Sequence, residues 1–539
     1  MKRIISGIFL FVIWSVSAQN PYFEISKQME IYNDVLKKLS TNYIDDINIG
    51  DMMQKNTKRM LNGLDRFTTF YDEQGILNQK MRQEGHFGGL GINIRYKDSI
   101  ILVTDIFKNS PAAEKLKIGD KITAIEDKKV SDLSAKVASN LLKGAAGSEV
   151  ALTVKRNGKT LNLKIKRADI KLDAVTGTYL DGDIGYIRFV KFNKLASRQV
   201  KKALLDLKSQ GAKKLIIDVR GNPGGLLNEV IKIVNFFIPK GKVVVTTKGR
   251  FDKYNRTYMT RNPSVDEEMP IVILVNNHSA SASEILSGSL QDYDRAVIIG
   301  DTTYGKGLVQ RTYKLKYGTY MKQTISKYYI PSGRLIQKID YWHRDKNGKP
   351  LLMRDNLPEK DYKTTNGRTV HNLGGVVPDI ELKTEANASL IKDLINKSIL
   401  FDYATWYYYT KSQPKNITDF RLTDEDFDNL IKFMNDRQLF PKSDAEKILK
   451  KAKEKALKEQ QAVSVIKAYE QLEKEYKQQN INILKKYKTY ILSELSKDLI
   501  NRYFQKTGLI QYNVQHDPVI LKAKEILNNR EKYNKILGK

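Results

Sequence analysis

Ser281 has the surroundings in this sequence that best suit a serine nucleophile. It lies in the segment Val275–Ile285, where an apolar strand expected over 271–275 ends and an amphipathic helix begins. A serine at such a strand-to-helix elbow presents its hydroxyl at the edge of a sheet, with the N–H of Ala282 nearby to stabilise an oxyanion. Ser281-x-x-Glu284 is also the spacing of a capping box, a frequent helix start, so the segment alone leaves both interpretations open.

A serine nucleophile needs a base, and Lys306 is a candidate because glycines flank it directly after an apolar strand expected over 296–299. Burial disfavours an ammonium ion, and bringing a lysine pKa from ~10.4 to near neutrality costs about 4 kcal/mol, which the fold must supply. Gln310 can hydrogen-bond the amine without adding charge. A solvated side chain is the alternative for a lone lysine, and the full phosphate-binding pattern around Gly-Lys-Gly is absent.

A third segment, 215–225, combines an apolar strand with the turn Asn222-Pro223-Gly224-Gly225 before a helix. The backbone N–H groups of Gly224 and Gly225 could stabilise an oxyanion. A tight strand-to-helix turn also needs glycine for its dihedral angles, and for the segment taken alone this structural interpretation is favoured.

A glycine-rich segment, 85–92, suggests peptide binding. Its glycines allow successive backbone N–H groups to point into one concavity, which suits a carboxylate, and a strand that begins at Ile92 would offer its edge to an extended peptide. The segment resembles the carboxylate-binding loop of PDZ domains, and this resemblance covers residues 85–168. It predicts a binding site for substrate tails at Gly88, Gly89, Leu90, Gly91 and Ile92.

Together the segments resemble the carboxyl-terminal processing peptidases, also called tail-specific proteases. That family carries an apolar strand into Asn-Pro-Gly-Gly, then Ser-Ala-Ser-Ala-Ser-Glu, then Thr-x-Gly-Lys-Gly-x-Val-Gln, and this sequence has all three in that order over a resemblance of about residues 25–382. Leu64-Asp65 matches a family motif that usually includes Pro-His, which is missing here. The later segments 329–334 and 374–379 also match.

The resemblance implies a serine endopeptidase that acts through an acyl-enzyme, with no metal and no organic cofactor. Ser281 is the implied nucleophile, Lys306 the base and Gln310 the residue that orients the lysine. The oxyanion would be held by Ala282, Gly224 and Gly225. Arg167, at the end of the PDZ segment, is the residue implied to couple tail binding to catalysis.

The elements that must position these residues follow from hydrophobic periodicity. Strands and helices alternate from Ile184 to about residue 299, which predicts an α/β core. The family fold implied by the resemblance is a spiral core of the Clp-protease/crotonase type, with an inserted PDZ domain and helical regions at both ends. The domains expected are 1–18 signal peptide, 19–84 N-terminal helical segment, 85–168 PDZ domain, 169–382 Ser/Lys protease core and 383–539 C-terminal helical region.

Composition and the first eighteen residues indicate the class of protein and its location. Of 539 residues, 41% are hydrophobic and 28% charged, which fits a globular protein, and cysteine is absent, which excludes disulfides and thiol catalysis. Lys2 and Arg3 precede an apolar run that ends in Val16-Ser17-Ala18, the layout of a secretory signal peptide, whose alternative is an uncleaved anchor. The sequence therefore predicts an exported protein of the periplasm or cell envelope.

The predicted partners are protein substrates with free apolar C-terminal tails, while an adaptor protein and a homo-oligomer stay open. The net charge of +31 is spread among acidic residues and accompanies no nucleic-acid motif, so no nucleic-acid partner is expected. Three alternatives stay open. His278 could be the base of a Ser–His–Asp triad, the chain could be a non-catalytic PDZ scaffold, and its basic helical tail could chiefly contact a cell wall or membrane surface.

Overall fold

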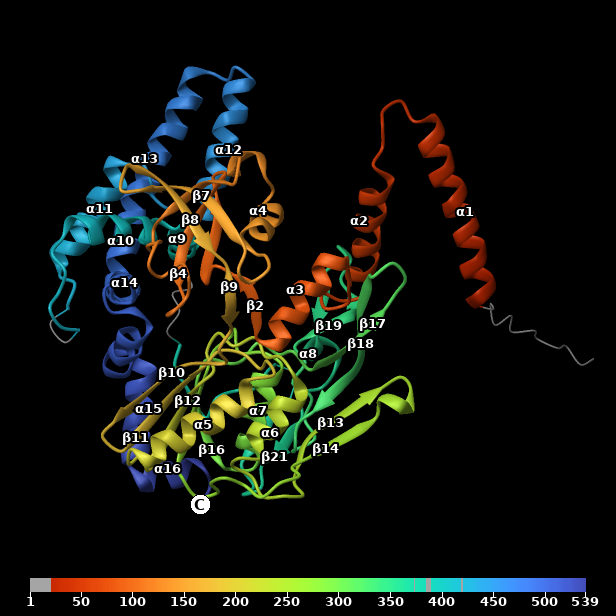
Figure 1. Cartoon of the computed structure of the whole chain (residues 1–539), viewed down its shortest axis with the longest axis vertical. Coiled ribbons are helices and arrows are strands. Elements are labelled where there is room, and N and C mark those ends of the chain that lie inside the picture. Colours follow the sequence, from red (N-terminus) through yellow and green to blue (C-terminus); the bar gives the residue numbers. More distant parts are fainter. Residues whose placement is uncertain (1–20, 373, 384–388, 418–419) are drawn as a thin grey trace, which may run out of the picture. The chain divides into compact units, whose positions relative to one another are not determined.

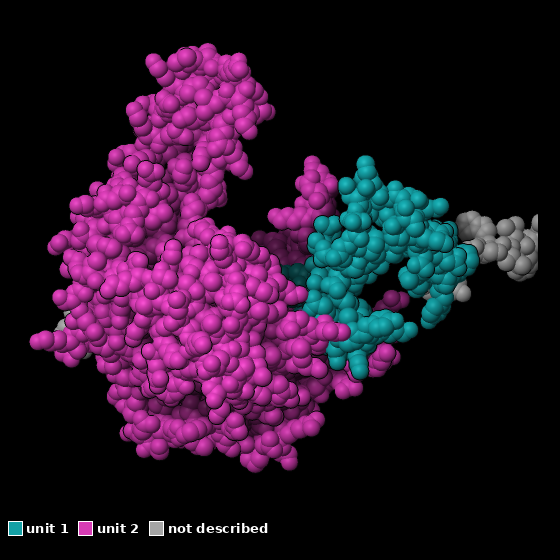
Figure 2. Space-filling model, turned by 45° about the horizontal axis from the view of Figure 1, so that its top comes forward, with its two compact units in different colours: residues 1–72, 312–323 teal, residues 73–311, 324–539 magenta. Residues whose placement is uncertain are grey.

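The structure is a computed structural model that describes residues 21–372, 374–383, 389–417 and 420–539 (Figure 1). The predicted signal peptide lies outside the described residues. The chain forms two compact units, residues 1–72 with 312–323 and residues 73–311 with 324–539 (Figure 2). All candidate catalytic and tail-binding residues belong to the second unit. Within the described ranges, every helix is too short or too polar to cross a membrane.

The first unit contains two helices and a short β-ladder. Helices α1 (Pro21–Asn42) and α2 (Ile49–Asn62) lie within the expected N-terminal helical segment. Strand β1 (Thr69–Tyr71) pairs antiparallel with residues 320–322 of β18 (Tyr320–Tyr329). Asp65 is buried and accepts hydrogen bonds from the N–H groups of Phe67 and Thr68, so the Leu-Asp motif fixes the turn that leads into β1.

The second unit begins with α3 (Glu73–Glu84) and a PDZ module. Its main sheet has the order β3-β4-β5-β7-β8, with β6 on β5, so β3 is an edge strand. Helix α4 (Ala135–Leu142) packs onto this sheet through Ala138 and Leu142. The strands are β2 (His86–Gly89), β3 (Ile92–Lys97), β4 (Ile100–Ile106), β5 (Lys121–Ile125), β6 (Lys128–Lys129), β7 (Glu149–Arg156), β8 (Lys159–Lys166) and β9 (Ala168–Lys171).

A six-stranded sheet forms the centre of the protease core. Its order is β10-β11-β12-β15-β16-β23, in which β10 runs antiparallel to β11 and the others are parallel. The parallel strands are apolar on both faces, as expected for a sheet covered on both sides. They are β10 (Val175–Asp181), β11 (Ile184–Phe189), β12 (Lys214–Asp218), β15 (Ile271–Val275), β16 (Ala296–Gly300) and β23 (Ile380–Glu381).

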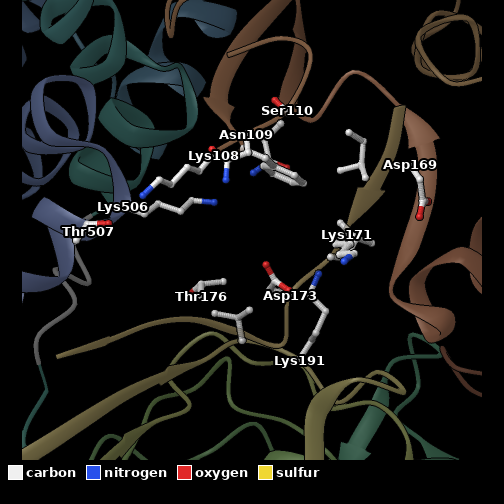
Figure 3. Close-up of a pocket in the computed structure, with 15 residues that line it drawn as sticks. Lys108, Asn109, Ser110, Asp169, Lys171, Asp173, Thr176, Lys191, Lys506 and Thr507 are labelled. Atoms are coloured by element: carbon white, nitrogen blue, oxygen red, sulfur yellow. The ribbon is translucent and has the colours of Figure 1, made fainter. Parts of the chain in front are cut away.

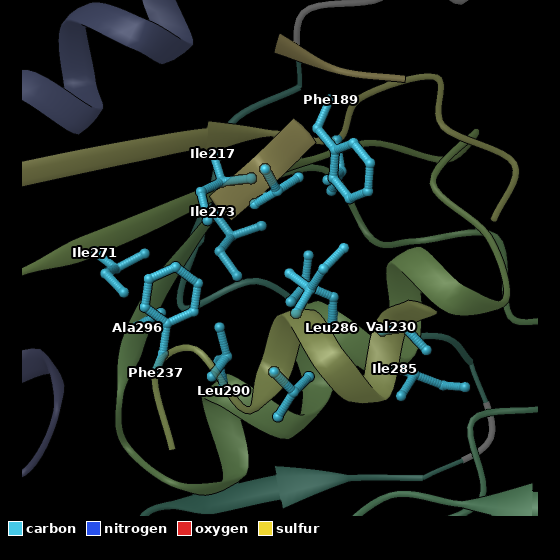
Figure 4. Close-up of a cluster of buried hydrophobic side chains, with 14 of the residues drawn as sticks. Phe189, Ile217, Val230, Phe237, Ile271, Ile273, Ile285, Leu286, Leu290 and Ala296 are labelled. Carbon is cyan, nitrogen blue, oxygen red and sulfur yellow. The ribbon is translucent and has the colours of Figure 1, made fainter. Parts of the chain in front are cut away.

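Helices α5 (Ala196–Ser209), α6 (Leu227–Val234) and α7 (Ala282–Asp292) cover one face of this sheet. Figure 4 shows Ile285, Leu286 and Leu290 of α7 beneath the strand residues Ile217 and Ile273. Every residue of α7 is buried. The helix that begins at the candidate nucleophile is therefore held on all sides by the core.

The opposite face of the sheet is covered by the end of the chain. Val519 and Ile520 of α15 pack in one buried cluster with Ile216 and Val272 of the sheet. Residues 510–537 thus complete the protease core, although the sequence suggested only a helical region. The helices are α9 (Ser389–Asn396), α10 (Ile399–Thr410), α11 (Asp424–Asp436), α12 (Asp444–Lys458), α13 (Val463–Lys486), α14 (Lys488–His516), α15 (Pro518–Asn528) and α16 (Arg530–Ile536).

The remaining strands form three smaller sheets. Residues 326–329 of β18 pair with β13, which in turn pairs with β14, and β17 pairs with β18. The bounds are β13 (Val243–Gly249), β14 (Arg256–Met259), β17 (Leu308–Lys314), β18 (Tyr320–Tyr329), β19 (Ile339–Arg344), β20 (Pro350–Leu352), β21 (Asp361–Lys363) and β22 (Thr369–His371).

Candidate active site

Ser281 lies between the buried strand β15 and helix α7, at the elbow expected from the sequence. Its backbone has φ +56° and ψ −111°, a conformation that costs about 1–3 kcal/mol for a residue with a side chain. Strain of this kind occurs at nucleophile elbows, where it exposes a hydroxyl at the end of a strand. The side chain is partly accessible, while Ser279, Ala280 and Ala282 are buried.

Two neighbouring turns hold the elbow in place. The N–H of Ala280 donates to the carbonyl oxygen of Asn222 at 3.0 Å, and the hydroxyl of Ser283 donates to the same oxygen at 2.8 Å. The hydroxyl of Ser279 donates to the carbonyl of Val219 at 2.8 Å. The Asn-Pro-Gly-Gly turn after β12 is therefore bound to the serine-rich turn after β15, because parallel neighbours end at the same edge of the sheet.

Glu284 connects the Ser281 elbow to the Lys306 segment. Its carboxylate is fully buried and accepts the N–H of Ser281 at 2.7 Å and the N–H of Lys306 at 2.9 Å, both on Oε2. Its other oxygen accepts the hydroxyl of Thr303 and the N–H of Gly305, each at 2.6 Å. Burial raises the pKa of Glu284, and these four hydrogen bonds act in the opposite direction. The capping residue expected at helix N3 thus also organises the Lys306 segment.

Tyr328 of β18 connects the same two residues through their carbonyl groups. Its hydroxyl lies 2.7 Å from the carbonyl oxygen of Lys306 and 3.2 Å from that of Ser281. The ring is buried, and burial raises the pKa of the phenol well above its usual value, so the group stays a donor. Sequence analysis missed Tyr328, because a tyrosine in a strand carries no local signal of such a contact.

The predicted oxyanion residues meet at this elbow. A Cβ on Gly224, which has φ +92°, would lie 2.9 Å from the Cβ of Ser281 and 2.8 Å from the nitrogen of Ala282. Ala282 is the first residue of α7, where the helix offers no acceptor for its N–H. The N–H of Gly224 itself donates to Oδ1 of Asn222 at 3.0 Å. Gly225 forms a parallel bridge with Phe192.

Two further candidates lie close to the proposed nucleophile and base in the sequence: His278 precedes Ser281, and Gln310 follows Lys306. The side-chain nitrogen of Gln310 donates to Oγ1 of Thr324 at 3.3 Å, a contact across the β17–β18 pair. The assignment of Gln310 to the Lys306 amine stays a prediction. His278 is exposed in the turn before the elbow, and its backbone N–H donates to Asn276.

A network of charged side chains lies next to the Asn-Pro-Gly-Gly turn. The guanidinium of Arg220 donates to both oxygens of Asp218 and, at 3.0 Å each, to both oxygens of Asp517. Arg188 and the hydroxyl of Tyr186 complete the partners of Asp218. Burial acts to raise the pKa of Asp218, but Arg220 and Arg188 outweigh it and hold that pKa well below its ordinary value. Asp517 caps α15, so the C-terminal helices contact the turn.

The predicted tail-binding loop begins the PDZ sheet. Gly88 and Gly89 pair with β9, Leu90 is buried in the module's core, and Gly91 has φ +77°. Ile92 begins the edge strand β3, which has a partner only on its β4 side within the described sheet. Gly88 and Gly89 lie in the ladder with β9, so Leu90, Gly91 and Ile92 are the positions next to a strand edge that a peptide can extend.

Arg167 contacts the C-terminal end of helix α4. Its guanidinium donates to the carbonyl oxygens of Leu141 at 2.8 Å and Glu149 at 2.8 Å, and to the hydroxyl of Ser148 at 2.9 Å. A cation at a helix C-terminus satisfies carbonyl groups that have no helical partner. The structure therefore gives Arg167 a structural role within the PDZ module, and its coupling role stays a prediction.

Comparisons with known proteins agree with this architecture. Family models match "Peptidase family S41" at residues 183–341, "PDZ domain" at 88–166 and "Probable PDZ-protease, C-terminal helical domain" at 390–527. A carboxy-terminal-processing protease from Bartonella bacilliformis is 32% identical over 378 residues, which cover 68% of this chain and 85% of that protein. A probable CtpA-like serine protease from Staphylococcus aureus is 38% identical over 255 residues, 47% of this chain and 51% of that protein.

Among solved structures, the photosystem II D1 C-terminal processing protease matches with 25% identity and a TM-score of 0.36, over 64% of this chain and 85% of its own. The curated relatives and family models establish the class: this chain belongs to peptidase family S41, the carboxy-terminal-processing serine proteases with a PDZ domain. The family and the α/β fold class predicted from the sequence are confirmed, as is the expectation of a serine peptidase.

Proposed function

We propose that this chain is an exported endopeptidase that binds the free, apolar C-terminal tails of its substrates and cleaves them with Ser281 and Lys306. One observation carries the catalytic assignment. Glu284 accepts the N–H groups of both residues on a single oxygen, which holds the segment of the base against the segment of the nucleophile. Acyl transfer requires a base held near the nucleophile, and the shared contact to Glu284 supports this for the two backbone segments.

In the proposed reaction, the neutral amine of Lys306 takes the proton of the Ser281 hydroxyl as the oxygen attacks the scissile carbonyl. The developing oxyanion accepts hydrogen bonds from the N–H of Ala282 and from the glycine turn. Within that turn Gly224 already donates to Asn222, so Gly225 is the preferred donor. Lys306 returns its proton to the leaving amine, and water then releases the acyl group with Lys306 again as base.

Tail recognition rests on the PDZ loop and the edge strand. The substrate carboxylate would accept N–H groups at Leu90 and Gly91, and the residues before it would extend β3 as an added strand. Gln310 would orient the amine of Lys306. Export rests on the pattern of the first eighteen residues.

The test uses a model protein with a free apolar C-terminal tail. Matched substrates carry the same tail amidated or ending in charged residues, and Ser281→Ala protein is the control. Cleavage that needs the serine, the free carboxylate and the apolar tail is expected. Equal cleavage of all three substrates would contradict tail recognition, and cleavage by the Ser281→Ala protein would contradict the assignment of the nucleophile.

A further inference from the structure

A large cavity of about 800 Å³ lies where the PDZ module, the protease core and helix α14 meet (Figure 3). Its volume falls in the range of ligand pockets, roughly 300–1,000 Å³. Its PDZ wall includes Ser110 and Ile170, its core wall includes Thr176 and Val190, and α14 contributes Thr507. The cavity belongs entirely to the second compact unit.

The cavity is lined by four lysines, at residues 108, 171, 191 and 506, and two aspartates, at residues 169 and 173. Figure 3 shows the amines of Lys108 and Lys506 directed into the space. Asp169 lies 3.2 Å from His86, Asp173 accepts the side-chain amide of Gln199 at 2.7 Å, and Lys506 pairs with Asp105 at 2.9 Å. The other three lysines still outnumber the two aspartates of the lining.

Lys191 is the lysine of the lining whose surroundings most favour a nearby anion. It is partly buried, and in the described part of the chain its amine makes no ion pair or hydrogen bond, as is also true of Lys108 and Lys171. Burial lowers the pKa of Lys191, the charges of Lys506 and Arg82 act in the same direction, and the charge of Asp173 acts against them. Lysines that outnumber the neighbouring carboxylates repel one another, and a bound anion would relieve this repulsion.

The cavity adjoins both parts of the proposed substrate site. Lys191 directly precedes Phe192, whose N–H donates to the carbonyl of Gly224 at 3.1 Å. On the other side the hydroxyl of Ser110 donates to the carbonyl of Gly91 at 3.2 Å. A substrate bound with its tail at Gly91 and its scissile bond at Ser281 would pass this cavity between the two sites.

We propose that the cavity is a specificity site that binds acidic side chains of the substrate, placed between its C-terminal tail and the scissile bond. Lys191 and Lys171 supply the cations. This inference rests on the proposed function, because it assigns a substrate preference to the same site. The occupant is a carboxylate of an aspartate or glutamate, which a lysine amine pairs with as a point charge.

The experiment compares two substrates that share one free apolar tail and differ only in the preceding spacer, rich in Glu or in Gln. Wild-type enzyme is expected to have a KM about fivefold to tenfold lower for the Glu spacer, as hydrogen-bonded charges predict. Lys171→Gln/Lys191→Gln protein should lose this difference. The control Lys128→Gln/Lys240→Gln removes the same charge at exposed lysines outside the cavity and should keep it.

Equal KM values for the two spacers in the wild type would overturn the proposal, as would loss of the difference in the control. A second measurement makes the outcome independent of catalysis: binding of both peptides to Ser281→Ala protein with and without the cavity lysines. If neither peptide is cleaved but the Glu peptide still binds more tightly through Lys171 and Lys191, the proposed activity fails and the cavity assignment stands. If amidating the tail removes the lysine effect, the terminal carboxylate is the occupant and the proposal is wrong.

Discussion

The backbone N–H groups of Ser281 and Lys306 donate to one and the same atom, Oε2 of Glu284, at 2.7 and 2.9 Å. The two backbone nitrogens therefore lie no farther apart than the sum of these two hydrogen-bond lengths. The hydroxyl of Tyr328 joins the two residues again through their carbonyl groups. Two buried side chains thus fix the relative position of the proposed nucleophile and base through the backbone.

Tyr328→Phe tests this connection. The change removes one hydroxyl from a buried ring and leaves the carbonyl groups of Ser281 and Lys306 without that donor. We expect kcat to fall about tenfold with KM nearly unchanged, because a lost buried hydrogen bond costs about 1–3 kcal/mol and here disturbs positioning. Steady-state kinetics on a tail substrate measure both constants. An unchanged kcat in a folded variant would show that the hydroxyl does not position the pair.

Gly224→Ala should abolish activity by displacing the nucleophile. A Cβ there would lie 2.6 Å from the carbonyl oxygen of Ala280 and 2.9 Å from the Cβ of Ser281. We expect at least about a 100-fold loss in kcat, since small displacements of reacting groups have effects of that size. Gly241→Ala is the matched control: it has a similar φ of +87° and open space around the new methyl group. That variant should lose about 1 kcal/mol of stability and keep its activity.

Asp517→Asn separates the two contacts made by that side chain. Asparagine still caps α15 through its oxygen, but it removes the charge that pairs with Arg220 beneath the oxyanion turn. We expect kcat to fall several-fold and the free energy of unfolding to fall by about 2 kcal/mol. Asp444→Asn, at the exposed start of α12, changes the same chemistry away from the site and serves as the control. Equal kinetics in both variants would contradict a role for the C-terminal helices in the active site.

The lowered pKa of Asp218 indicates how the free energy of unfolding depends on pH. Its pKa is lower in the folded protein than its ordinary value of 3.8, so the folded state binds fewer protons. The stability that follows is present above pH 3.8 and is lost as the pH falls toward the folded value. Urea unfolding between about pH 5 and pH 2 should show this decline.

The matched variant for this measurement is Asp218→Asn. It should be less stable at neutral pH by about 3 kcal/mol, because Arg220 and Arg188 lose a buried partner. Its stability should also fall less steeply on acidification. The same slope in the variant and the wild type would show that other carboxyl groups cause the acid dependence.

Sequence reasoning succeeded where burial imposes a simple pattern. Strand Ile271–Val275 was predicted to the residue, because both of its faces are buried and its sequence is entirely apolar. Strand β18 was missed, since its Tyr-Met-Lys-Gln pattern is partly exposed and lacks clear alternation. The helix that begins after Ser281 was also expected, because the capping spacing Ser281-x-x-Glu284 is visible in the local sequence.

The contacts that assemble the site were not predictable, because they join residues far apart in the chain. Arg220 and Asp517 are 297 residues apart, and Tyr328 follows Lys306 by 22 residues in a different element. Glu284 was assigned only to the helix start, although half of its hydrogen bonds go to residues 305 and 306. The residue types identified the segments around Gly224, Ser281 and Lys306 in the sequence. The contacts between these segments depend on the tertiary structure.

The most direct test of the account compares kcat/KM for Lys306→Ala and His278→Ala on the same tail substrate. We expect kcat/KM of Lys306→Ala to fall to the background of Ser281→Ala, and that of His278→Ala to stay within about threefold of the wild type. Full activity in the Lys306→Ala protein, together with loss in the His278→Ala protein, would contradict the assignment and make the histidine the base.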